Sequence, residues 1–349
     1  MEGHISLFVV LGLVITTVAA QSCPTGCICP RPGHVSCTGL SSFPKSFPAS
    51  TEVVTIYLSS LPEIPPDSFK GLPLLNTVSL YKNTIGKIRN CAFKNLAQMK
   101  SLNIYQSNID TIESGAFSNM SFVNPGSFSL YSITIGDIKP YAFSSLSDSR
   151  FSIYSANITI IRSFAFHNIS AKSFSLYLAN IDFMDTSAFE DFNGTKSASI
   201  YSSYIANTHC NTLDVLQEDV GNVFSFYQLT FNCSCQLAWL FEAAQTNLNL
   251  AASLNRNRCH NTSTVFPGRR LDGLNATLLC PGGRESSQCL KPKLQFPSQC
   301  PLPGAPTQSP LPGNGDDSSS SSSSNGHCPH VLGFLLTLVT GVFLKNQLR

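Results

Sequence analysis

Tyrosine recurs through this chain at nearly equal intervals. Eight of the ten tyrosines are separated by 24, 24, 26, 23, 23, 24 and 26 residues. A repeat of this length folds as stacked coils, because one repeat cannot bury its own apolar face without its neighbours. The eight are Tyr57, Tyr81, Tyr105, Tyr131, Tyr154, Tyr177, Tyr201 and Tyr227. The period therefore predicts a solenoid, and it leaves the question of what the chain binds open.

A second landmark follows the tyrosine in six repeats. It is a phenylalanine preceded by serine or alanine: Phe69, Phe93, Phe117, Phe143, Phe166 and Phe189. Apolar and polar residues alternate just before each tyrosine, as in Val78-Ser79-Leu80-Tyr81, which is typical of a strand. We expect Val78 and Leu80 to lie in the core and Ser79 and Tyr81 to face outward. The phenylalanines are expected to fill the core on the side away from the strands.

The repeating unit resembles the leucine-rich repeat, whose strand segment reads L-x-x-L-x-L-x-x-N-x-L. The resemblance covers residues 52–231 and implies an α/β-type solenoid, a leucine-rich repeat horseshoe of about seven to eight repeats with a parallel concave sheet. In that family the asparagine after the strand satisfies backbone groups at the turn. Here it survives only as Asn83, so the sequence does not assure regular turns elsewhere. Extra residues around Asn124-Pro125-Gly126 predict a bulge or loop in the fourth repeat.

Cysteines cluster at both ends of the repeats, where an open solenoid would expose its core. Four lie in residues 21–51 and four in residues 232–280. They resemble the N-terminal and C-terminal cysteine caps of extracellular leucine-rich repeat proteins. That resemblance implies the pairs Cys23–Cys29, Cys27–Cys37, Cys233–Cys259 and Cys235–Cys280, whereas spacing alone leaves three connectivities open for each set of four. A zinc site formed by these cysteines is the alternative to disulfide bonds, but Cys-x-Cys spacing suits zinc poorly. Trp239, the only tryptophan, is expected in the core of the C-terminal cap.

Four further cysteines precede the C-terminal tail: Cys91, Cys210, Cys289 and Cys300. Cys91 and Cys210 lie five repeats apart, which is more than about 20 Å at the usual spacing of strands. They cannot pair with each other, because a disulfide needs Cα atoms within about 7 Å. We interpret Cys91 as a buried thiol or an intermolecular bridge. A local Cys289–Cys300 bridge is predicted, and Cys210 could instead reach the C-terminal region.

Both ends of the chain have the composition of segments that are removed. Residues 1–20 contain an apolar run that ends in Val18-Ala19-Ala20, which predicts a signal peptide. Residues 281–326 are rich in Cys, Pro and Ser and cannot build a core, so they predict a stalk. Residues 327–349 end in a short apolar run and predict a GPI-attachment signal, with Ser319, Ser320, Ser321 and Asn325 as attachment candidates. A short single-pass anchor is the alternative.

Glycosylation sequons support a secreted chain. Six are candidate sites: Asn119, Asn157, Asn168, Asn193, Asn261 and Asn275. A seventh, at Asn232, is hindered by the cysteine that follows it. Sugars at Asn119, Asn168 and Asn193 would lie far from the strands and leave the tyrosines open.

The tyrosine stripe is the candidate ligand face, formed by Tyr57, Tyr81, Tyr105, Tyr131, Tyr154, Tyr177 and Tyr201 with Lys82 and Gln106. Tyrosine and serine are also the residues that antibody paratopes use. The alternative is a purely structural ladder of stacked rings, which needs no ligand. The position after each tyrosine varies, and we regard it as the better candidate for specificity.

The overall layout resembles GPI-linked leucine-rich repeat receptors, such as the Nogo receptor and the variable lymphocyte receptors. The resemblance implies a glycoprotein for ligand recognition or adhesion on the outer leaflet of the plasma membrane. It would bind a protein or glycan ligand and signal only through a transmembrane co-receptor. A self-associating coat or matrix protein is the second hypothesis. No catalytic, phosphate-binding or metal motif occurs, so neither an enzyme nor a cofactor is expected. The net charge of +2 includes no basic run and gives no reason to expect nucleic acid.

Overall fold

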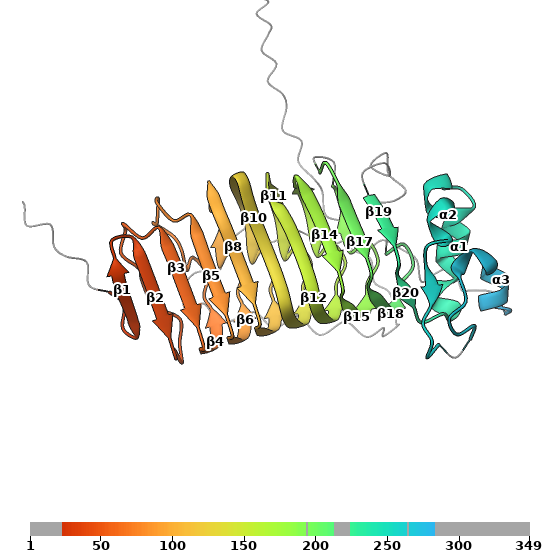
Figure 1. Cartoon of the computed structure of the whole chain (residues 1–349), viewed down its shortest axis with the longest axis horizontal. Helices are drawn as coiled ribbons and strands as arrows, with labels where there is room; N and C mark the ends of the chain where they lie inside the picture. Colours follow the sequence, from red (N-terminus) through yellow and green to blue (C-terminus); the bar gives the residue numbers. More distant parts are fainter. Residues whose placement is uncertain (1–22, 193–194, 213–223, 264, 283–349) are drawn as a thin grey trace, which may run out of the picture. The chain divides into compact units, whose positions relative to one another are not determined.

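The repeats stack into a solenoid of parallel strands. The computed structural model describes residues 23–192, 195–212, 224–263 and 265–282. Each coil begins with the strand that ends in tyrosine, and neighbouring coils pair in parallel with the same residues opposite one another, as Tyr57 is opposite Tyr81 and Tyr81 opposite Tyr105. Figure 1 shows these strands side by side along the stack. The leucine-rich repeat solenoid with a parallel sheet is therefore confirmed.

Strands lie on three sides of the coil, whereas the sequence predicted them on one. The first ladder contains β2 (His34–Thr38) and the strands that carry the eight tyrosines: β3 (Val53–Tyr57), β5 (Thr77–Tyr81), β8 (Met99–Tyr105), β10 (Phe117–Ile138), β12 (Arg150–Ile161), β14 (Ser173–Tyr177), β17 (Ala198–Tyr201) and β19 (Phe224–Tyr227). The second ladder contains strands that begin three residues after a tyrosine: β4 (Ser60–Ile64), β6 (Thr84–Ile88), β9 (Asn108–Ile112), β15 (Asn180–Met184), β18 (Tyr204–Thr208) and β20 (Thr230–Phe231). It ends with β21 (Arg258–Cys259) of the C-terminal cap, which pairs with β20. The third carries the phenylalanines: β7 (Phe93–Lys94), β11 (Phe143–Ser147), β13 (Phe166–Ser170) and β16 (Phe189–Glu190). The long strands β10 and β12 continue from the first ladder into the second, and β10 also begins in the third.

Residues in the left-handed region form the corners between these ladders. Each tyrosine is followed by such a residue, and all eight have φ between 49° and 55°: Leu58, Lys82, Gln106, Ser132, Ser155, Leu178, Ser202 and Gln228. The corner before the third ladder has the same conformation, as at Cys91 and Tyr141. A left-handed residue with a Cβ costs roughly 1–2 kcal/mol, so the stacking of coils must hold these corners in place.

Serine replaces the family asparagine at several corners. The backbone N–H of Ser59 donates to Asn83 Oδ1 (3.0 Å), and that of Asn83 donates in turn to Ser107 Oγ (3.1 Å). Ser203 accepts the backbone N–H of Ala179 in the same way (3.0 Å). Serine can replace the asparagine because its hydroxyl reaches the N–H of the preceding coil. The corners that lack both asparagine and serine, such as those before Ile133 and Ala156, keep the same backbone conformation. The corners are therefore regular, although the sequence retains only Asn83.

The core is a column of phenylalanine rings under the third ladder. Phe93, Phe117, Phe143, Phe166 and Phe189 are fully buried, and consecutive rings lie 4.7–5.1 Å apart.

The register of β10 against β8 shifts between Phe122 and Ser127, so the extra residues of the fourth repeat are accommodated as an irregularity in that strand. This confirms the predicted bulge.

Disulfide-bonded caps close both ends of the described solenoid. At the N-terminal end, β1 (Cys27–Arg31) runs antiparallel to β2. The C-terminal cap contains η3 (Cys235–Leu237), α1 (Ala238–Ala244), α2 (Leu248–Leu254), η4 (Leu271–Gly273) and α3 (Ala276–Leu279). The bonds are Cys23–Cys29, Cys27–Cys37, Cys233–Cys259 and Cys235–Cys280, the pairs that the family resemblance implied.

The remaining cysteines require a correction. Cys91 is buried as expected, but it is disulfide-bonded and so is not a thiol; Cys210 is disulfide-bonded too. Cys289 and Cys300, the signal peptide, the stalk and the GPI-attachment candidates lie outside the described residues. No helix within the described ranges is long and apolar enough to cross a membrane.

Candidate functional site

The tyrosine rings form one continuous stack along the first ladder. Neighbouring ring centroids are 4.7–5.1 Å apart, and the interplanar angles are 3–10°. The ladder places them there because every coil pairs in register, so the last residue of each strand is opposite its equivalent. All eight tyrosines are half-buried. Stacking covers both ring faces of the inner tyrosines, so a ligand would meet ring edges and hydroxyl groups.

Two rows of mostly small polar residues lie beside the rings on the same face; Val53 and Arg150 are the exceptions. The row two residues before tyrosine contains Thr55, Ser79, Asn103, Ser129, Ser152, Ser175, Ser199 and Ser225. Ser129 Oγ and Ser152 Oγ lie 3.3 Å apart, within hydrogen-bonding distance. The row before that contains Val53, Thr77, Ser101, Ser127, Arg150 and Ser173. We call the eight tyrosines and these two rows the tyrosine face; Arg150 is its one charged member among the residues named.

The environment of the stack disfavours ionised tyrosine. Burial raises the pKa of Tyr131, and repulsion from the neighbouring Tyr105 and Tyr154 raises it further. The pKa values of Tyr105, Tyr177 and Tyr201 are raised for the same reasons, with burial the larger cause. These four tyrosines therefore present neutral phenol groups at physiological pH.

The residues predicted for specificity form the edge of this face. Lys82 and Gln106 occupy the left-handed corners after their tyrosines, and both are exposed. The corner directs the side chain out of the coil, while the next residue turns back into the core, as Asn83 and Ser107 do. This geometry explains why residues as different as Leu58, Lys82 and Ser132 occupy one position.

The predicted glycosylation sites lie on other parts of the coil. Asn119 and Asn168 are exposed at corners after the phenylalanines, and their amides donate to Asn95 Oδ1 and Ser145 Oγ. Asn157 is different, because it lies on the second ladder, where its Oδ1 accepts from Asn180. Asn193 lies outside the described residues. Asn275 caps α3 through its side-chain oxygen, and Asn261 is exposed in the C-terminal cap.

Ion pairs between coils were not predicted from the sequence. Arg89 lies between Glu63 and Glu113, at 3.6 Å and 3.4 Å from their carboxylates. Arg162 donates twice to Asp137, which also accepts from Lys139. Burial raises the pKa of Asp137, but the bonds from Arg162 and Lys139 outweigh it and hold the pKa below its usual value. Opposite charges about one repeat apart are the signal that could have revealed these pairs.

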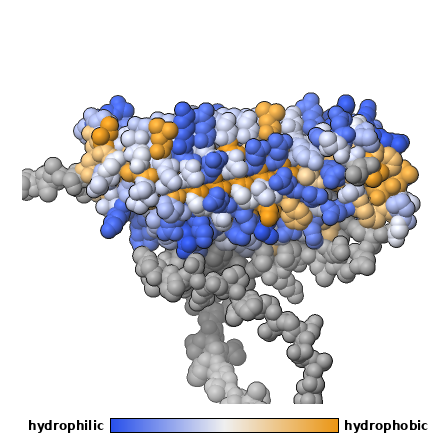
Figure 2. Space-filling model, turned by 90° about the horizontal axis from the view of Figure 1, so that it is seen from below, coloured by the Kyte–Doolittle hydropathy of each residue, from blue (hydrophilic) through white to orange (hydrophobic). Residues whose placement is uncertain are grey.

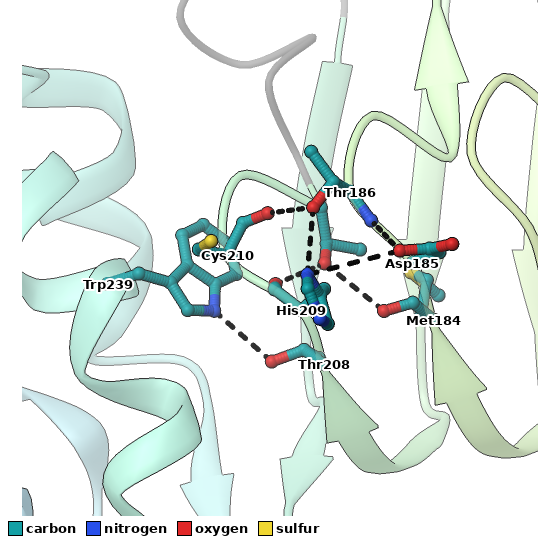
Figure 3. Close-up of polar contacts among 8 residues, drawn as sticks. Met184, Asp185, Thr186, Thr208, His209, Cys210 and Trp239 are labelled. Carbon is teal, nitrogen blue, oxygen red and sulfur yellow. Dashed lines mark hydrogen bonds and ion pairs between the residues drawn. The ribbon is translucent and has the colours of Figure 1, made fainter. Parts of the chain in front are cut away.

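The junction with the C-terminal cap is polar at its centre. Trp239 is buried, and its indole N–H donates to Thr208 Oγ1 (3.2 Å), so it seals the cap against the last coils. Beside it, Thr186 Oγ1 donates to the carbonyl oxygen of Cys210 (2.8 Å) and lies 3.1 Å from Nδ1 of His209 (Figure 3).

In the space-filling view, hydrophilic residues cover most of the visible surface, and a narrow apolar band runs along the repeats (Figure 2).

Comparisons with known proteins identify the class of repeat. The model of the BspA type leucine rich repeat region matches residues 44–137 and 126–215, in six copies. Among solved structures, human 5T4 (Wnt-activated inhibitory factor 1, trophoblast glycoprotein) aligns with 75% of this chain and 99% of its own, at 16% identity and a TM-score of 0.36. A chain from the octameric complex of Latrophilin 3, Unc5D and FLRT2 aligns with 74% of this chain and 99% of its own, at 16% identity and a TM-score of 0.25. No curated protein matches the sequence.

Proposed function

We propose that this leucine-rich repeat solenoid, closed by a disulfide cap at each end, is a cell-surface recognition protein that binds a protein ligand through the tyrosine face. The observation that carries the proposal is the continuous row of half-exposed phenol groups beside rows of serine, on a sheet that fixes their spacing. Tyrosine provides contact area with little loss of side-chain entropy, and serine provides adaptable hydrogen bonds. Lys82 and Gln106 at the corners would supply selectivity.

The ring stack limits how the site can be tested. Substituting alanine for Tyr105, Tyr131 and Tyr154 would remove ring contacts along the middle of the stack and would confuse binding with folding. Phenylalanine at the same positions keeps the rings and removes only the hydroxyl groups. Tyr204→Phe is the matched control, because Tyr204 lies on the second ladder, away from the face.

The assay is binding of the labelled, glycosylated ectodomain to a panel of cell types. Three lost hydroxyl contacts, at about 0.5–1.5 kcal/mol each, predict at least a tenfold loss of affinity for the triple phenylalanine variant. Tyr204→Phe is expected to bind like the wild type. If the folded triple variant binds unchanged, the tyrosine face is not the site. Binding that survives protease treatment of the cells but not glycosidase treatment would replace the protein ligand by a glycan.

Self-association is the second candidate function. Tyrosine recurs in every coil of the tyrosine face and serine in most of them, and an equally periodic surface on a second copy would match them coil by coil. Sedimentation of the ectodomain over a range of concentrations decides this point. A strict monomer would exclude the coat or matrix hypothesis, and a dimer that the triple phenylalanine variant abolishes would favour it.

For the cellular location, we propose export through the secretory pathway and a GPI anchor at one of Ser319, Ser320, Ser321 or Asn325. The four cap disulfides support export, because such bonds persist in oxidising compartments. Signalling would then require a transmembrane co-receptor. Phosphatidylinositol-specific phospholipase C is expected to release the protein from intact cells. Retention on the cells, with a known GPI-linked protein released in parallel, would favour a short spanning anchor.

A further inference from the structure

The cations of the tyrosine face have no acidic partners. Six lie on this face or along its border: Lys82, Lys100, Arg150, Lys172, Lys196 and Arg256. None of the six forms an ion pair with another described residue. Several cations elsewhere in the described coils are neutralised, as Arg89 is by Glu63 and Glu113 and Arg162 is by Asp137. The contrast indicates that the charges of the tyrosine face are available to a partner.

Three of these cations lie in consecutive coils. Arg150 is in the first ladder, opposite Ser127 on one side and Ser173 on the other. Lys172 and Lys196 lie opposite one another just before β14 and β17, because these strands pair in register. Arg150 and Lys196 are exposed, and Lys172 is partly exposed. Two steps of about 4.8 Å place the three cations within about 10 Å along the stack, and we call them the basic patch.

The other three cations extend the border of the face. Lys100 precedes its coil's serine row as Lys172 does, and the backbone N–H groups of both donate to the preceding coil. Lys82 occupies the corner after a tyrosine. Arg256 takes the position of the tyrosine in the coil that belongs to the C-terminal cap, because its carbonyl oxygen accepts the N–H of the corner residue Gln228. The cations therefore follow the face into the cap.

Acidic residues are concentrated on another side of the coil. The rows of the tyrosine face and the corners after its tyrosines contain neither Asp nor Glu. Glu52 and Asp148 lie at the border before the strands, and no ion pair joins either of them to the basic patch. The second ladder, by contrast, carries Glu63, Asp110 and Asp182. The whole chain has 22 basic and 20 acidic residues, so this separation gives the tyrosine face a positive potential that the net charge does not reveal.

We infer that the ligand of the tyrosine face is a protein that lays an acidic segment across the basic patch. The inference rests on the proposed function and names the chemistry of the partner. The guanidinium group of Arg150 matches a carboxylate in a two-point contact, and the hydroxyl groups of Ser127 and Ser173 on either side can donate to the same group. An extended chain covers about 10 Å with about three residues, so a short run of Asp or Glu fits the patch.

A sulfated glycan is the other polyanion that a basic patch can bind. Sugars contact aromatic residues through the ring faces, but Tyr154, Tyr177 and Tyr201 beside the patch are each stacked on both faces. The ring edges and hydroxyl groups that remain suit the irregular polar surface of a protein. The geometry therefore favours an acidic protein segment over a glycan.

A fluorescein-labelled peptide of six glutamates tests charge recognition on the protein purified from secretory cells. The peptide should bind, its affinity should fall as the NaCl concentration rises, and the same peptide made of six glutamines should not bind. The patch variant, Arg150→Gln with Lys172→Gln and Lys196→Gln, should bind the glutamate peptide roughly tenfold more weakly, because each exposed ion pair contributes a few-fold. Failure of the glutamate peptide to bind at low salt would overturn the inference.

A matched variant controls for the change in net charge. Lys45→Gln with Lys87→Gln and Arg258→Gln removes the same three charges from exposed residues away from the tyrosine face. It should bind the glutamate peptide like the wild type. Equal losses in the patch variant and in this control would show that net charge alone attracts the peptide, and would equally overturn the inference.

Binding of the labelled protein to cells separates this inference from the proposed function. Weaker binding by both the patch variant and the triple phenylalanine variant would support both. If the triple phenylalanine variant loses binding but the patch variant binds like the wild type, the tyrosine face is the site and its ligand is not acidic, which refutes the inference alone. If neither variant loses binding, both are refuted. Binding that heparinase treatment of the cells abolishes would replace the acidic protein by a sulfated glycan.

Discussion

The stack of tyrosine rings makes a quantitative prediction about stability. Tyr131 stacks on two neighbours, Tyr105 at 4.7 Å and Tyr154 at 5.0 Å, whereas Tyr57 at the end of the stack contacts only Tyr81, at 5.0 Å, among the tyrosines. Each stacked pair contributes about 0.5–1.5 kcal/mol beyond burial of area. Tyr131→Ala should therefore cost about 1–3 kcal/mol in stacking and Tyr57→Ala about half as much. Both rings are half-buried, so the area term is similar in the two variants.

Urea unfolding of the ectodomain, followed by circular dichroism, measures both costs. A double variant sharpens the result: Tyr105→Ala and Tyr131→Ala singly remove two contacts each, but together they remove three, because they share one. The double variant should therefore cost about 0.5–1.5 kcal/mol less than the sum of the single variants. Tyr131→Phe keeps the ring and should lie near the wild type.

Equal costs at Tyr57 and Tyr131, together with additive single variants, would refute the reasoning. Stacking would then contribute nothing measurable, and the regularity of the stripe would need another cause, with ligand binding the first to consider. The measured result thus separates a structural ladder from one kept for recognition.

Three further outcomes follow from the same structure. The pKa values of Tyr105, Tyr131, Tyr177 and Tyr201 are raised in the folded state, so their contribution to stability is complete below about pH 10, the unfolded value, and is lost as pH rises through the folded pKa values. Absorbance at 295 nm should show that these tyrosines ionise at higher pH than free tyrosine and that their ionisation is coupled to unfolding. Titration like that of free tyrosine would contradict this prediction. Ser107→Ala leaves the buried N–H of Asn83 without its acceptor and should lower the free energy of unfolding in urea by about 1–3 kcal/mol. Ser132→Ala at an exposed corner should lower it by less than about 0.5 kcal/mol. Equal costs would show that the hydrogen bond between these corners does not stabilise the fold. Phe143→Ala, in the middle of the buried column, should cost about 3–5 kcal/mol by the same assay, and a cost below that of Tyr57→Ala would show that the column is not the core.

Much of the solenoid could be predicted because its signals are periodic. Val78 and Leu80 are buried and Ser79 and Tyr81 are partly exposed, as strand alternation requires. The second ladder was missed because its strands, such as Thr84–Ile88, bury their second and fifth residues and so do not alternate strictly. The third ladder was missed because strands such as Phe93–Lys94 are too short to show any alternation. The left-handed corners were missed too: residues like Lys82 and Tyr141 carry no glycine signal, and only hydrogen bonds between stacked coils reveal and sustain their backbone.

The sequence by itself determined the repeat, the parallel strands and the tyrosine stripe, because these depend on spacing along one chain. The tertiary structure decided which residues stack on the faces of the tyrosine rings and which serines replace the asparagine at the corners. It also decided that Cys91 and Cys210 are both disulfide-bonded. Those properties depend on which residues of different coils meet, and contacts between coils arise only when every coil takes its place in the stack.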